Sequence, residues 1–86
     1  MHLVTLALVH PDPAELEPST VTEILWSHTT PADGVEHVRT RVRSDRYDIA
    51  VFLIADGEEQ ALATARDLCD RAVAASPILR SCRLTN

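Results

Sequence analysis

The sequence predicts one α+β domain, residues 1–86, whose elements follow the order strand, helix, strand, strand, helix, strand. Three observations lead to this prediction. A short, apolar, β-branched run opens the chain, a second such run occupies residues 47–55, and a long stripe of apolar residues at helical spacing follows it. A chain of 86 residues is long enough for one small domain with a single core.

The first strand is predicted at residues 2–9, HLVTLALV, which Pro11 and Pro13 then bring to an end. Its side chains are apolar on both faces, which is typical of a strand covered on both sides. A short helix is predicted from about 19 to 28, because Thr20 and Glu23 have the spacing of a capping box. The β-branched residues of this segment leave a strand as the alternative.

The segment 34–56 decides the fold, and it has two interpretations. In one, Thr30 caps a helix over residues 31–43, and the domain is a small α/β sheet. In the other, residues 35–42 and 47–55 are the two strands of a hairpin joined by the polar turn RSDR. We favour the hairpin, because Gly34 would lie in the first turn of the helix and the run is rich in valine and threonine, which are poor helix formers.

A long helix and a last strand complete the prediction. Asp56 is the expected cap of the helix, Ser76-Pro77 ends it, and Asp67 and Arg71 form an exposed pair four residues apart. The last strand is predicted over residues 78–85, ILRSCRLT, at an edge of the sheet, because polar residues lie on both of its faces.

This order resembles the ferredoxin-like βαββαβ sandwich, in which two helices cover one face of the sheet and the first and third strands are central. The resemblance is to a fold that serves many functions, and no family matches the chain residue by residue. Both predicted central strands are apolar on both faces, whereas two helices cover only one face. The resemblance therefore implies an uncovered apolar patch of roughly several hundred Å², which is large for a soluble monomer.

We expect a second copy of the chain to cover this patch, because a two-fold interface needs only one self-complementary surface. A fold-back of the loop at 10–19 is the alternative, although a segment so rich in proline and glutamate makes a poor lid. The predicted interface residues of the homodimer are Leu3, Thr5, Ala7, Val9, Ala50, Phe52 and Ile54.

Four arginines lie close together in a chain whose net charge is −5. Arg39, Arg41 and Arg43 would project from one side of an edge strand, with Arg46 in the turn. Such a row protects an edge from aggregation, and it can also bind an acidic protein partner or an anion. Nucleic acid binding is not expected, because the domain is acidic and its central strands lack a platform of aromatic residues.

The residue patterns indicate no catalytic motif, metal site or cofactor site. The four histidines lack ligand spacing, Cys69 falls on the apolar helix stripe, and Cys82 is expected to be partly exposed. We therefore expect a non-catalytic interaction protein of the cytoplasm, with reduced thiols and no membrane span. Two alternatives stay open: a domain that senses a metabolite between paired sheets, and a cofactor-free dimeric α+β-barrel enzyme with His10, His28 or His37 as a base.

Overall fold

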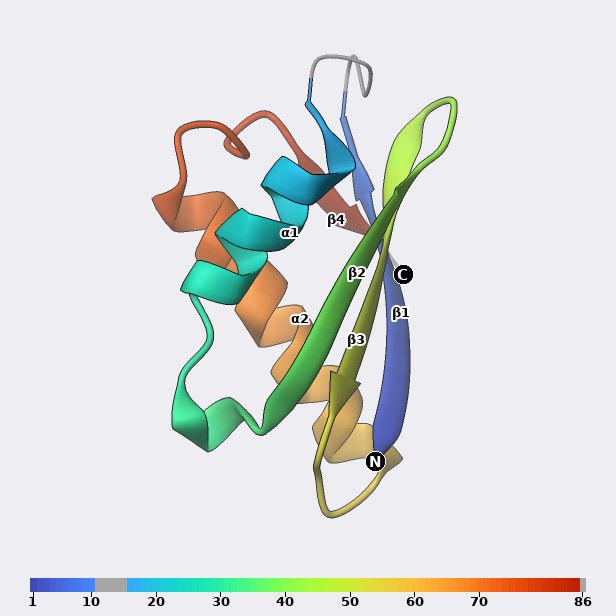
Figure 1. Cartoon of the computed structure of the whole chain (residues 1–86), viewed down its shortest axis with the longest axis vertical. Helices are drawn as coiled ribbons and strands as arrows, with labels where there is room; N and C mark the ends of the chain where they lie inside the picture. Colours follow the sequence, from blue (N-terminus) through green and yellow to red (C-terminus); the bar gives the residue numbers. More distant parts are fainter. Residues whose placement is uncertain (11–15, 86) are drawn as a thin grey trace.

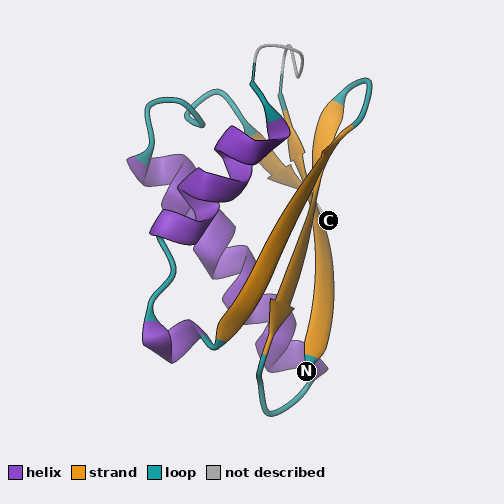
Figure 2. Cartoon of the chain, viewed as in Figure 1, coloured by secondary structure: helices purple, strands orange, loops and turns teal. Residues whose placement is uncertain are grey.

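A four-stranded antiparallel sheet with two helices packed on one of its faces makes up the structure, a computed structural model that describes residues 1–10 and 16–85 (Figures 1 and 2). This arrangement confirms the α+β class. The strand order across the sheet is β2-β3-β1-β4. In chain order the elements are β1 (His2–Val9), α1 (Pro18–Ser27), a 3₁₀ turn (Pro31–Asp33), β2 (Val35–Val42), β3 (Arg46–Leu53), α2 (Glu58–Ala75) and β4 (Arg83–Thr85).

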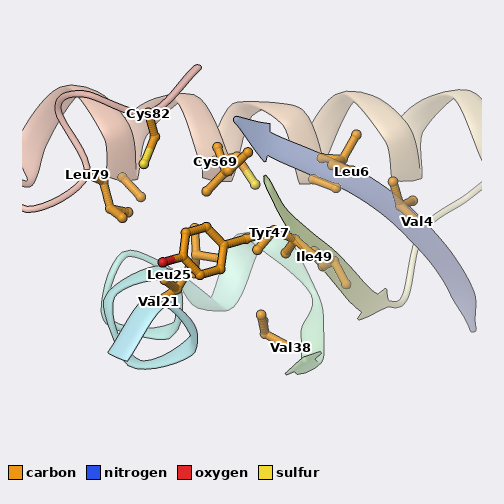
Figure 3. Close-up of a cluster of buried hydrophobic side chains, with 14 of the residues drawn as sticks. Val4, Leu6, Val21, Leu25, Val38, Tyr47, Ile49, Cys69, Leu79 and Cys82 are labelled. Atoms are coloured by element: carbon orange, nitrogen blue, oxygen red, sulfur yellow. The ribbon is translucent and has the colours of Figure 1, made fainter. Parts of the chain in front are cut away.

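The two central strands, β1 and β3, pair along their full length, from His2 opposite Leu53 to Val9 opposite Arg46. Side chains alternate between the two faces of a strand, and residues that lie opposite each other in the register share a face. The register therefore assigns each side chain of β1 and β3 to one of the two faces of the sheet. One set of alternate residues is buried beneath α1 and α2, together with Val21 and Leu25 of α1 (Figure 3). The buried residues from the central strands are Val4, Leu6, Leu8, Tyr47, Ile49, Val51 and Leu53.

The hairpin interpretation of segment 34–56 is confirmed, and the alternative helix over 31–43 is wrong. The capping signals around Thr30 are real, but they start only one 3₁₀ turn, in which the Thr30 backbone N–H donates to Asp33 at 2.8 Å. Gly34 then takes a left-handed conformation, φ 69°, and the chain turns into β2. Between β2 and β3 the Arg43 N–H donates to the Arg46 carbonyl at 2.7 Å.

Gly34 is also pressed against the end of β3. The Ile54 N–H donates to the Gly34 carbonyl at 2.8 Å, and a Cβ on residue 34 would lie 2.6 Å from the Ile54 carbonyl oxygen. Both the positive φ and this close approach require glycine. Gly34, which argues against a helix in the sequence, is therefore the residue at which the chain turns into the first strand of the hairpin.

The predicted ends of the two helices need small corrections. Helix α1 begins at Pro18 with Glu17 as its N-cap, so the Thr20–Glu23 capping box does not form. Helix α2 begins after Gly57, and not after a cap by Asp56. The backbone N–H of Asp56 instead donates a hydrogen bond to the Gln60 side-chain oxygen, at 2.6 Å.

The C-terminal strand is much shorter than predicted. Residues 77–81 form turns, and only Arg83–Thr85 pairs, with Ala7–Val9 of β1. Cys82 is buried rather than partly exposed, because its N–H bonds the Leu79 carbonyl and the turn carries both side chains into the core (Figure 3).

Arg71 of α2 does more than pair with Asp67, 2.9 Å away. Its guanidinium donates to both carboxylate oxygens of Asp33, at 3.0 and 3.1 Å, and to the His28 carbonyl at 3.1 Å. Burial alone would raise the pKa of Asp33, but the Thr30 N–H and the Arg71 guanidinium lower it overall. This contact ties α2 to the connection between α1 and β2.

Candidate interaction surface

The face of the sheet opposite the helices has no helix over it among the described residues (Figure 1). The structure brings six of the seven predicted interface residues together on it, at alternate positions of β1 and β3. Ile54 follows immediately after β3, which ends at Leu53. Exposure differs among the seven: Leu3, Thr5 and Ile54 are exposed, Val9, Ala50 and Phe52 are half-buried, and Ala7 is buried.

This open face is less uniformly apolar than the sequence suggests. Its apolar end is formed by Leu3 and Phe52, which lie opposite each other in the register. At the other end Asp48 alternates with Ala50 and Phe52 on β3, and a depression of about 340 Å³ there is lined partly by Arg46 and Thr85. Asp48 is not among the residues predicted from the sequence, although its position in the alternation of β3 places it on this face.

The exposed edge of the open face is β2. His37, Arg39 and Arg41 lie opposite Phe52, Ala50 and Asp48 respectively. The rings of His37 and Phe52 are 5.7 Å apart between centroids, so the histidine covers part of the phenylalanine. On the other side of β2, the Thr22 hydroxyl of α1 donates to the Thr40 hydroxyl at 2.7 Å.

The four predicted arginines fall into two pairs. Arg43 lies just after β2, and Arg46 is the first residue of β3 rather than a turn residue. Their Nε atoms donate to the two carboxylate oxygens of Asp48, at 2.8 and 3.1 Å. The hydrogen bond from Arg43 is the largest of the contacts that lower the pKa of Asp48.

Arg39 and Arg41 form the second pair, and both are exposed. Neither has a hydrogen bond or an ion pair with the described residues. Arg39 lies opposite Ala50, and the Asp48 carboxylate opposite Arg41 is occupied by Arg43 and Arg46. These two guanidinium groups are therefore available to an anionic partner.

Two shallow depressions flank the outer edge of β2. One, of about 510 Å³, reaches from Arg39 and Arg41 round the edge to Thr40 and Val42. The other, of about 250 Å³, lies between α1 and β2 and is lined by Thr22, Glu23, Trp26, Glu36, His37 and Val38.

The histidines considered as possible bases have separate environments. His10 is buried near Tyr47, with its Nε2 3.4 Å from the Ser81 hydroxyl oxygen. His28 has Nδ1 2.9 Å from the Ile24 carbonyl, at the end of α1, while His37 lies on the open face. Within residues 1–10 and 16–85, no group of three metal-ligating side chains comes together.

The cysteines are both buried free thiols. Burial, and secondarily the nearby Asp70 carboxylate, raise the pKa of Cys69 to about 12, and burial raises the pKa of Cys82 as well. A thiol with a raised pKa is a poor nucleophile near neutral pH, because little of it is thiolate.

Comparison with known proteins gives no significant match to a family model, to a curated protein or to a solved structure. No described helix is long and apolar enough to cross a membrane.

Proposed function

We propose that the protein acts by association, and that a second copy of the chain packs against the open face of its sheet. The observation that carries this proposal is the exposure of apolar side chains on and next to this face: Leu3 is 58% exposed and lies opposite the half-buried Phe52, and Ile54, which follows β3, is 61% exposed. Contact with a second copy would remove these side chains from water, at roughly 25 cal/mol for each Å² of apolar surface.

The size of the face limits the strength of the dimer. An eight-residue strand is about 27 Å long and strands lie about 4.8 Å apart, so three long strands offer a plane of roughly 400 Å². Interfaces of standard size bury about 800 Å² on each partner. We therefore expect a dimer that dissociates on dilution.

Charge favours one orientation of the two copies. A two-fold axis perpendicular to the strands would stack β2 on β2 and bring Arg39 and Arg41 of both copies together. An axis parallel to the strands places β2 over the partner's β4 and keeps the two arginine pairs apart. We expect the second orientation, because close like charges oppose association.

Light scattering over a concentration series tests the proposal. The mass should rise from 9.5 kDa toward twice that value as the concentration increases toward about 1 mM, the range of weak complexes. Leu3→Asp should stay monomeric. Ile78→Asp is the matched control, because Ile78 is similarly exposed, at 50%, but lies in the turn after α2. A wild-type mass of 9.5 kDa throughout the series would refute homodimerisation.

We also propose a role for the arginine edge: Arg39 and Arg41 dock an acidic partner. Their lack of ion-pair partners among the described residues supports this role, whereas Arg43 and Arg46 are engaged with Asp48. Arginine binds carboxylates through paired N–H donors, which gives such docking direction as well as attraction.

We infer that the fold is of the ferredoxin-like kind and that the protein works in the cytoplasm. The element order β1-α1-β2-β3-α2-β4, with both helices on one face, supports the first inference. The two free thiols are in keeping with the second, because a reducing compartment maintains them.

A further inference from the structure

We propose that the outer edge of β2 binds an extended segment of a partner protein as an additional strand, and that this segment alternates acidic and apolar residues. The inference rests on the proposed role of the arginine edge and specifies the kind of partner that it takes. Three features of the protein support it: a free strand edge, cationic side chains on one side of that edge, and apolar side chains on the other.

The free edge is a property of the topology. Strand β2 lies at the end of the sheet, and β3 is its one neighbour among the described residues. Its pairing with β3 is regular from His37 to Val42, after an irregularity between Val35 and His37. Its backbone groups on the outer side are therefore able to pair with an incoming strand, as in other complexes formed by strand addition. The depression that reaches round this edge and the depression between α1 and β2 leave room for the strand's side chains.

Charge specifies the side chains on the open face. Arg39 and Arg41 are two residues apart and project to that face, so their spacing equals the repeat of side chains on one side of a strand, about 6.6–6.8 Å. Acidic residues at alternate positions of the incoming segment would each meet one guanidinium group.

The helix side of the same edge has the opposite preference. The depression there lies beside Trp26, which is 48% exposed, and Val38, and Val42 is 42% exposed further along the strand. Glu23 and Glu36 line this depression too and would repel an acidic side chain. The intervening residues of the segment are therefore apolar.

A second copy of β2 does not meet these requirements. Antiparallel pairing of two β2 strands around Arg39 or Thr40 would place arginine opposite arginine, because residues on the same face then oppose each other. Like charges directly opposite one another destabilise a strand pair. The arginines thus oppose self-pairing in these registers, while they attract an acidic strand.

Fluorescence anisotropy with short labelled peptides tests this inference. The probe is a peptide of alternating glutamate and valine, and its comparison peptide has the same composition with all glutamates in one block. We expect the alternating peptide to bind the wild-type protein, the block peptide to bind several-fold more weakly, and N-methylation of alternate amides to abolish binding, because methylation removes strand hydrogen bonds.

Protein variants distinguish the effect of Arg39 and Arg41 on peptide binding from the effect of the protein's net charge. Arg39→Gln combined with Arg41→Gln should weaken binding of the alternating peptide about 5- to 10-fold, as expected for two partly exposed charge contacts. Arg80→Glu is the matched control, since it lowers the net charge by the same two units at an exposed site after α2 and should leave binding unchanged. The monomeric Leu3→Asp variant should bind as the wild type does.

The outcomes distinguish this inference from the function on which it rests. Equal binding of the alternating, block and N-methylated peptides, lost with the arginine pair, would overturn strand addition but support acidic docking. No binding of any peptide, or equal weakening by Arg80→Glu, would overturn both. Neither result depends on the light-scattering test of homodimerisation.

Discussion

Replacement of Gly34 is the sharpest test of how the hairpin is entered. Gly34→Ser would place a side chain on a residue with φ 69°, and left-handed geometry costs roughly 1–2 kcal/mol for residues other than glycine. The new Cβ would also lie 2.6 Å from the Ile54 carbonyl oxygen, so the backbone must shift and weaken the hydrogen bond from the Ile54 N–H. That bond contributes about 0.5–1.5 kcal/mol.

Together these effects predict a loss of about 2–3 kcal/mol in the free energy of unfolding. Urea denaturation followed by circular dichroism should show the midpoint lowered by roughly 1–2 M, given typical slopes for small domains. Gly57→Ser is the matched control: its φ of −175° is extended, a Cβ there meets nothing within 4 Å, and serine suits an N-cap position. Equal midpoints for Gly34→Ser and Gly57→Ser would refute the reasoning.

Two further predictions concern titration and thiol chemistry. Because the pKa of Asp33 is lowered in the folded protein, its contribution to stability is present above the ordinary carboxyl pKa of about 4 and is lost as pH falls through the folded value. Asp33→Asn should therefore be less stable than the wild type at pH 7, with the difference narrowing at acidic pH; a constant difference in urea midpoint across pH would contradict this. Cys69 and Cys82 should react slowly with a thiol reagent in the native protein at pH 8 and fast once it is unfolded, because burial raises both pKa values; fast native labelling would show that the core opens.

The short-range patterns predicted the main elements well. The alternation in residues 35–42, the polar turn and the apolar run after it identified the hairpin, and the apolar stripe identified α2. These features depend on residues only a few positions apart. The ends of α1 and α2 shifted by one or two residues because backbone geometry at Glu17 and Gly57 decided the caps.

The sequence predicted most residues of the candidate surface but not the ion pairs of Arg43 and Arg46 with Asp48. Six of the predicted interface residues lie on one face because strand alternation alone groups them. In the sequence, one predicted binding group contains Arg39, Arg41, Arg43 and Arg46. The turn after β2 separates them, because it brings Arg43 and Arg46 onto Asp48.

What the sequence determined by itself was therefore the kind and order of the elements and the sets of residues that share a face. Only the tertiary structure decided which set of the central strands lies under the helices, that Cys82 is buried beside Leu79, and that Arg71 joins Asp33 across 38 residues. Both faces of β1 are apolar, so hydrophobicity could not choose between them. The choice depends on where the helices cross the sheet, which is set by contacts between segments far apart in the chain.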